Sequence, residues 1–304
     1  MTDVTFILWL QQFANGFLDW FFTTITKIGN PEYYIIVIPL FYWCGRKKDA
    51  FRLALFFLIS SYVNSAIKGL TDMTRPSADQ VRILYQESTL GSSSFPSAHT
   101  QGAAAFWGYI AWYFRKKSVM AFCIIIIFLV GLSRLYLGLH YPIDILVGLV
   151  LGIFILLCYN GLLNRTAGQI ADFPLVIRLL VSIIIPIFLL MIPGHDIGML
   201  VGFAIGLLTG YQLEAEYLNF NESGSTIKQV IKFLIGMSGL FGIRILLKDL
   251  FILIAFNGWN VITADVVRYG IIGFWATYLA PWLFIKLGLS RKKSKFFGNA
   301  VKYF

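Results

Sequence analysis

Apolar residues in this chain come in long continuous blocks that short polar stretches separate. Most blocks approach the roughly 20 residues that an α-helix needs to cross the hydrocarbon layer of a membrane. Continuous blocks favour spanning helices over the alternating pattern of a membrane β-barrel. The pattern predicts an all-α, polytopic membrane protein whose blocks lie at residues 31–45, 50–71, 98–114, 118–138, 142–162, 173–192, 197–213, 227–247 and 265–287.

The segment before these blocks, residues 4–28, is rich in aromatic residues and amphipathic. Its pattern is compatible with a spanning helix and equally with a helix that lies in the membrane interface.

Composition supports a membrane protein. The chain of 304 residues is 58% hydrophobic and only 13% charged, whereas soluble domains are roughly 45–50% apolar and about 25% charged. This balance excludes a soluble globular enzyme and a disordered chain. The three cysteines (Cys44, Cys123 and Cys158) lie in or at the end of apolar runs without metal-ligand spacing, so we interpret them as packing residues.

The net charge of +10 has a pattern that predicts orientation. Basic clusters lie between apolar blocks at residues 46–48, 115–117 and 291–293, as cytoplasmic loops do under the positive-inside rule. We therefore expect a multi-pass protein of the cell membrane and no nucleic-acid partner. With these clusters inside, the span ends near residues 68–76 and 133–144 emerge together on the non-cytoplasmic side, with those near 96–99.

Three polar clusters at these span ends carry the candidate chemistry. They run from Lys68 to Pro76, from Phe95 to His99 and from Ser133 to Asp144. Ionisable residues at membrane depth cost about 2.5–3.5 kcal/mol each on insertion scales, so they mark functional sites by default. The three cations Lys68, Arg75 and Arg134 would repel one another unless they hold an anion, and a phosphate dianion suits them.

Two predicted helix starts strengthen the case for an anion site. Ser97 follows Pro96 as a helix cap, and Pro142 fits an early position of the next helix. Helix N-termini present unsatisfied N–H groups and a partial positive charge, which favour oxyanion binding.

The two histidines of these clusters can divide the labour of phosphoryl transfer. His140 and Asp144 are four residues apart, so they meet on one face of a helical turn. A carboxylate fixes the imidazole tautomer and stabilises the imidazolium that forms when the imidazole attacks phosphorus. His99 lacks such a carboxylate in its motif and suits a general acid for the leaving alkoxide.

Together, the clusters resemble the signature K-x6-RP, PSGH and SR-x5-H-x3-D of the PAP2 superfamily, the type 2 phosphatidic acid phosphatases. The resemblance covers roughly residues 1–162. It implies a six-helix core and chemistry without metal or cofactor. The resemblance assigns a phosphohistidine to His140, leaving-group protonation to His99 and orientation of His140 to Asp144, with phosphate bound by Lys68, Arg75, Ser97, Ala98 and Arg134. Ala98 stands where the family usually has Gly, but its backbone N–H is still available.

We therefore expect a metal-independent phosphatase that cleaves a lipid phosphate monoester or diphosphate at the non-cytoplasmic face, with an amphiphilic phospholipid-type substrate whose tail stays in the bilayer. Three alternatives use the same residues. They are a lipid phosphotransferase, a sugar-phosphate phosphatase of the glucose-6-phosphatase type, and a lipid or ion transporter without enzymatic activity.

Residues 163–304 carry no motif with assignable chemistry. We expect about four further spans and a basic cytoplasmic tail there, as an extension to the core at 1–162. This extension could build a groove for the lipid tail, mediate a homodimer or carry a separate substrate. His195, in the sequence Pro-Gly-His-Asp, is interpreted as a turn residue.

Overall fold

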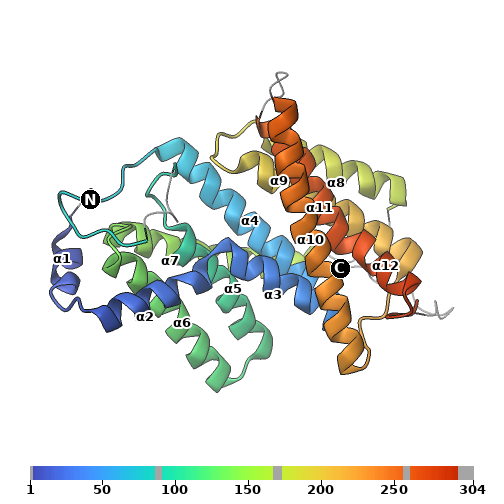
Figure 1. The fold of residues 1–304 in the computed structure, drawn as a ribbon, viewed down its shortest axis with the longest axis horizontal. Helices are drawn as coiled ribbons and strands as arrows, with labels where there is room; N and C mark the ends of the chain where they lie inside the picture. Colours follow the sequence, from blue (N-terminus) through green and yellow to red (C-terminus); the bar gives the residue numbers. More distant parts are fainter. Residues whose placement is uncertain (1–2, 86–90, 167–172, 256–260, 294–304) are drawn as a thin grey trace. The chain divides into compact units, whose positions relative to one another are not determined.

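The chain is seen in a computed structural model that describes residues 3–85, 91–166, 173–255 and 261–293 (Figure 1). Within these residues all regular secondary structure is helical, apart from one isolated β-bridge between Phe220 and Lys292. The all-α prediction is confirmed. The end of the predicted basic tail, including Lys295, lies outside the described residues.

The helices follow one another with short connections, except for the long segment between α4 and α5. They are α1 (Thr5–Gln11), α2 (Gly16–Thr26), α3 (Pro31–Cys44), α4 (Lys47–Thr71), α5 (Ala98–Phe114), α6 (Lys117–Tyr136), α7 (Pro142–Thr166), α8 (Leu175–Leu189), α9 (Ile197–Leu213), α10 (Thr226–Ala255), α11 (Val261–Phe274) and α12 (Ala280–Lys286). A 3-10 turn at Lys27–Gly29 precedes α3, and π-helical turns follow α9 and α11 at Glu214–Leu218 and Trp275–Leu279.

Five helices among the described residues are long and apolar enough to cross a membrane, which confirms the polytopic prediction. They comprise α4, α6, Pro142–Tyr159 of α7, Ile197–Leu218 and Thr226–Phe251 of α10. The helices α3, α5 and α8 are shorter, at 14, 17 and 15 residues. The six-helix count for the core stays a prediction.

The N-terminal segment, for which the sequence allowed a span, forms two helices of 7 and 11 residues. The side chain of Asn15 caps α2 by accepting a hydrogen bond from the backbone N–H of Leu18. At a rise of about 1.5 Å per residue, neither helix is long enough to cross a hydrocarbon layer of about 30 Å.

Contacts divide the chain into two compact units. The first comprises residues 1–34, 56–160 and 193–195, and the second comprises 35–55, 161–192 and 196–304. Residues 35–55, which precede most of the first unit in sequence, thus pack with the second. Each unit is described separately below.

In the first unit, α6 packs against α1, α2 and α5. Phe22 of α2 and Tyr136 of α6 share a buried cluster in which their ring centroids lie 4.5 Å apart. Helices α5 and α7 approach closely at Gly148, because a Cβ there would lie 2.8 Å from the carbonyl oxygen of Ser97. This close approach brings the beginnings of α5 and α7 together.

In the second unit, α9 packs tightly along α11. Two glycines of α9 permit this approach: a Cβ on Gly202 would lie 2.2 Å from the carbonyl oxygen of Val266, and one on Gly206 would lie 2.0 Å from that of Gly270. Backbone contact at small residues is the usual way that membrane helices associate closely.

The second unit also contains a buried ion pair with its hydrogen-bond partners, which we call the lysine–glutamate network (Lys47, Glu214, Asn219 and Phe220). The ammonium of Lys47 lies 2.8 Å from Oε1 of Glu214, and both side chains are almost completely buried. Lys47 also donates to Oδ1 of Asn219 and to the carbonyl oxygen of Phe220. Lys232 donates to the backbone carbonyls of Trp43 and Glu222.

Candidate active site

The beginnings of α5 and α7 form the floor of the candidate site. Ser97 is the N-cap of α5, and its hydroxyl oxygen accepts hydrogen bonds from the backbone N–H and the hydroxyl of Thr100. The backbone N–H of Ser97 donates to the carbonyl oxygen of Asp144, at 3.0 Å, and so ties the two helix starts together. The predicted pair of adjacent helix N-termini is present, with Pro142 as the first residue of α7.

The end of α6 determines where His140 lies. The N–H of Gly138 bonds to the carbonyl of Leu135, and the N–H of Leu139 bonds to that of Arg134, which is the Schellman pattern at a helix end. Gly138 has a φ of +71°, and a Cβ there would lie 2.5 Å from the carbonyl oxygen of Arg82. Glycine is therefore required at this turn, which ends α6 and leads to His140, two residues before the start of α7.

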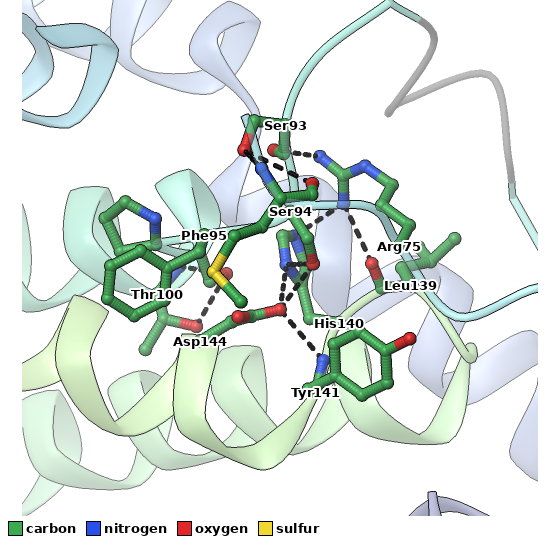
Figure 2. Close-up of polar contacts among 12 residues, drawn as sticks. Arg75, Ser93, Ser94, Phe95, Thr100, Leu139, His140, Tyr141 and Asp144 are labelled. Carbon is green, nitrogen blue, oxygen red and sulfur yellow. Dashed lines mark hydrogen bonds and ion pairs between the residues drawn. The ribbon is translucent and has the colours of Figure 1, made fainter. Parts of the chain in front are cut away.

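His140 and Asp144 meet as the four-residue spacing predicts. Nδ1 of His140 lies 3.3 Å from Oδ2 of Asp144, and both side chains are buried. The same carboxylate oxygen accepts hydrogen bonds from the backbone N–H of Tyr141, at 2.9 Å, and from the hydroxyl of Ser94. Figure 2 shows these three groups converging on Asp144. The carboxylate is thus held in position to orient the imidazole.

Arg75 lies on the other side of the His140 ring. Its Nη1 is 3.0 Å from Nε2 of His140 and also donates to the carbonyl oxygen of Leu139 (Figure 2). The remaining guanidinium donors bind Ser92 and the carbonyl oxygen of Ser93. The loop of residues 91–97 therefore fixes the guanidinium against the imidazole.

Lys68, near the end of α4, contacts the same loop. Its ammonium donates to the carbonyl oxygens of Ser93 and Ser94. Arg134, in the last turn of α6, is fully buried and donates to the hydroxyl of Thr26. His99, the second residue of α5, is also buried, and its Nε2 lies 2.8 Å from Oδ1 of Asn30.

The charges of the site act on His140. Burial, and then the positive charges of Arg75, Arg134 and Lys68, hold the pKa of His140 well below the ordinary 6.5, and a further contribution comes from His99. His140 is therefore neutral at pH 7. Burial lowers the pKa of Arg75 to about 10, so its guanidinium stays charged.

Seven of the eight predicted site residues have buried or half-buried side chains here, and all eight belong to the first unit; Ala98 is exposed at the start of α5. We call six of them the site cluster: Lys68, Arg75, His99, Arg134, His140 and Asp144. Sequence reasoning missed Ser94 and Asn30. Three consecutive serines before Pro96 were the available signal for Ser94, whereas Asn30 had none beyond a Gly-Asn-Pro helix start.

His195 lies in a turn, as predicted. This turn belongs by its contacts to the first unit: a Cβ on Gly194 would lie 2.6 Å from the hydroxyl oxygen of Ser65. A Cβ on Gly91 would lie 3.4 Å from Nε2 of His195, so the imidazole borders the loop of residues 91–97.

The described residues contain no group of three or more His, Cys, Asp or Glu side chains arranged to share a metal ion. In the site cluster a single carboxylate accompanies several cations, and this donor set suits an anion.

Two family models match the sequence. The PAP2 superfamily model matches residues 49–167, and the model of the transmembrane extension of PAP2 superfamily phosphatases matches residues 198–293. The lipid phosphate phosphatase delta of Arabidopsis thaliana is 29% identical over 167 residues, which are 50% of this chain and 40% of that protein. The chain therefore spans less than half the length of this relative.

A rat (Rattus norvegicus) sphingosine-1-phosphate phosphatase 1 is 24% identical over 329 residues, covering 92% of this chain and 75% of that protein. A crystal structure of a transmembrane PAP2-type phosphatidylglycerolphosphate phosphatase from Bacillus subtilis covers 53% of this chain and 84% of that chain, with 27% identity and a TM-score of 0.47.

Proposed function

Since this chain belongs to the PAP2 superfamily, we propose that it is a membrane phosphatase that releases phosphate from a lipid phosphate monoester or diphosphate through a phosphohistidine on His140. The single observation that carries this proposal is the arrangement around His140, whose Nδ1 meets a held carboxylate while Nε2 meets the guanidinium of Arg75. An oriented imidazole next to an anion-binding group is what nucleophilic attack on phosphorus requires.

In the first step, Nε2 of His140 uses its lone pair to form a bond to phosphorus, and the bond from phosphorus to the lipid oxygen breaks. Protonated His99 gives its proton to the departing alkoxide, so an alcohol leaves. Asp144 accepts the Nδ1–H hydrogen bond and stabilises the positive charge that develops on the ring. The lowered pKa of His140 keeps this lone pair available at neutral pH.

In the second step, water attacks phosphorus as His99 takes a proton from it. The phosphorus–nitrogen bond breaks, and inorganic phosphate leaves. Throughout, Lys68, Arg75 and Arg134 neutralise the phosphoryl oxygens, and the N–H groups at the start of α5, including that of Ala98, add partial positive charge. Ser97 keeps its hydroxyl proton for the phosphate, because the cap uses only its oxygen. No step calls for a metal.

The position of Lys68 along α4 supports a site on the non-cytoplasmic face of the membrane. Lys47 begins this helix within the basic cluster at residues 46–48, and Lys68 lies 21 residues later. At about 1.5 Å per residue the two ammonium-bearing positions are about 32 Å apart along the axis, which matches the thickness of the hydrocarbon layer. If the basic cluster is cytoplasmic, the site cluster faces the opposite side.

The proposed substrate class rests on the position of the site in the membrane and on how much of the chain is similar to one relative. A site at the end of a membrane helix suits an amphiphile whose tail stays in the bilayer. Similarity to a sphingosine-1-phosphate phosphatase runs through both the core and the extension. We therefore place a long-chain base phosphate first among the candidate substrates, before phosphatidate and polyprenyl diphosphate.

A substrate panel with purified protein tests the proposal. A long-chain base phosphate, phosphatidate, polyprenyl diphosphate and glucose 6-phosphate are each incubated in detergent with a chelator, and released phosphate is measured. We expect hydrolysis of at least one lipid substrate and none of the sugar phosphate. Loss of activity with chelator would contradict the metal-independent mechanism, and phosphorylated acceptor without free phosphate would indicate a phosphotransferase.

His140→Ala is the matched variant. It should lower turnover by at least about 10⁴-fold, because it removes the nucleophile, and it should leave inhibition by inorganic phosphate largely intact. His195→Ala, which removes the remaining histidine outside the site cluster, should keep activity within about threefold. Undiminished turnover in His140→Ala would refute the phosphohistidine, and transport surviving without hydrolysis would favour a transporter.

A further inference from the structure

Asn30 lies between the 3-10 turn and α3, and its side chain contacts His99. Oδ1 of Asn30 is 2.8 Å from Nε2 of His99, while Nδ2 of Asn30 donates to the hydroxyl of Tyr85 at 3.2 Å. An amide oxygen carries lone pairs and no proton, so Nε2 of His99 must be the donor. The contact with Asn30 therefore places a proton on Nε2.

The backbone beside Asn30 fixes which edge of the imidazole faces it. A Cβ on Gly29 would lie 3.1 Å from Cδ2 and 3.2 Å from Cβ of His99. The ring therefore packs its Cδ2–Nε2 edge against Gly29 and Asn30. Its other edge, with Nδ1, is turned away from this contact.

We propose that Asn30 is the positioning residue of the general acid: its side-chain oxygen holds Nε2–H of His99 and directs Nδ1–H toward the leaving oxygen of the substrate. This inference rests on the proposed phosphatase function and deepens it, because it assigns to a residue outside the three motifs a role in the same site.

The chemistry of the two partners explains why one histidine has an amide and the other a carboxylate. Asp144 brings a negative charge to His140, which stabilises the imidazolium formed on attack. Asn30 orients His99 without adding charge, so the protonated ring remains a stronger acid than it would be beside a carboxylate. A strong acid is what an alkoxide leaving group needs.

Tyr85 connects this contact to the nucleophile. Its hydroxyl accepts the amide hydrogen bond, and the preceding residue, Leu84, donates its N–H to the carbonyl oxygen of Leu137 at 3.0 Å. Leu137 begins the turn that carries His140. The segment at residues 84–85 thus contacts both the orienting amide of the acid and the turn of the nucleophile.

Asn30→Ala, assayed with two substrates that differ in leaving group, tests the inference. Dodecyl phosphate releases an alkoxide and needs the acid, whereas 4-nitrophenyl phosphate releases a stable phenolate and does not. In rapid mixing, the first-turnover rate with dodecyl phosphate should fall about 10- to 100-fold, a part of the 10²- to 10⁴-fold that general acids supply. The burst of nitrophenolate should stay within about threefold, as should KM.

Two further variants separate positioning from folding. Tyr85→Phe removes the hydroxyl that holds the amide, so its loss with dodecyl phosphate should be smaller than that of Asn30→Ala. Asn15→Ala makes the same side-chain change at the cap of α2 and should leave both first-turnover rates unchanged. Asn30→Asp keeps the acceptor but adds charge, and should extend activity to higher pH at a lower maximal rate.

Equal losses with both substrates in Asn30→Ala would show a merely structural role and overturn the inference, as would no loss with either. A wild-type protein that hydrolyses neither ester nor any lipid in the panel would instead overturn the phosphatase function itself. Wild-type hydrolysis with unchanged Asn30→Ala kinetics refutes only the role of Asn30, so the two failures are distinguishable.

Discussion

The two units of this protein each bury charged side chains, but they compensate the charge differently. In the lysine–glutamate network the ammonium of Lys47 faces the carboxylate of Glu214, and neutral oxygens complete its hydrogen bonds. In the site cluster, three cationic side chains accompany the single carboxylate of Asp144, and Arg75 uses its donors on loop oxygens and an imidazole. The first arrangement is balanced within itself, and the second has an excess of positive charge.

This difference separates a structural use of buried charge from a functional one. In a buried ion pair each charge has its partner, so the pair serves to hold together the two segments that carry it. An excess of fixed positive charge destabilises the folded protein through repulsion. Binding of a phosphate dianion relieves this repulsion, and the cations then stabilise the negative charge that develops in the transition state. We therefore expect substitutions in the site cluster to change activity more than stability, and substitutions in the network to do the reverse.

Asp144→Asn should have the largest effect. An amide carries no negative charge to stabilise the imidazolium of His140, so kcat should fall about 10³- to 10⁴-fold. The free energy of unfolding should change by no more than about 1.5 kcal/mol, because the amide oxygen can still accept hydrogen bonds from Ser94 and Tyr141. Phosphate release and thermal unfolding are measured on the same preparation.

If Asp144→Asn unfolds readily but keeps full activity per folded molecule, the buried charges of the site cluster serve stability rather than activity, contrary to our expectation. Asp79→Asn, in the exposed part of the segment before α5, provides the matched change of carboxylate to amide and should alter neither quantity.

Glu214→Ala should have the next largest effect, on stability. It leaves the buried ammonium of Lys47 without its carboxylate, which costs about 3–5 kcal/mol. The free energy of unfolding in detergent should fall by this amount, while kcat of the remaining folded protein stays within about twofold. Denaturant titration and initial rates provide the two readouts.

The double variant Lys47→Met with Glu214→Leu controls for this result. Removing both charges together avoids an unpaired ion, so stability should recover most of the loss of the single variant. If the double variant is as unstable as Glu214→Ala, packing rather than charge pairing accounts for the effect.

Local sequence patterns predicted the helices and several features of the site. Continuous apolar blocks identified the helical class, and the four-residue spacing of His140 and Asp144 identified their contact. Ser97 at its cap and Pro142 at the start of α7 followed from residue preferences at helix ends. These features depend on residues close together in the chain, so the local backbone geometry of helices and of their starts sets them.

The remaining features depend on partners far apart in the sequence. Asn30 is 69 residues from His99, and Lys47 is 167 residues from Glu214. No periodicity links such pairs, because tertiary packing alone brings them together. For the same reason no local pattern indicates that residues 35–55 pack with the second unit. From the sequence alone, Lys47 is interpreted as one member of a basic loop, although its side chain is buried in the structure.

A smaller effect should distinguish the two clusters by pH. The folded protein holds the pKa of His140 below 6.5, so it binds this proton less readily than the unfolded chain does. Unfolding then takes up a proton, and the contribution of His140 to stability is lost as pH falls below about 6.5.

For one group the slope of this pH dependence is at most about 1.4 kcal/mol per pH unit. His140→Asn should therefore show a shallower decline in unfolding free energy between about pH 6.5 and 5, whereas the Lys47→Met, Glu214→Leu double variant should not make this decline shallower. Inorganic phosphate should also flatten the wild-type decline, because a bound anion favours the charged imidazolium. A slope that persists unchanged in His140→Asn would mean that burial and the positive charges of the site cluster do not lower the pKa of this histidine.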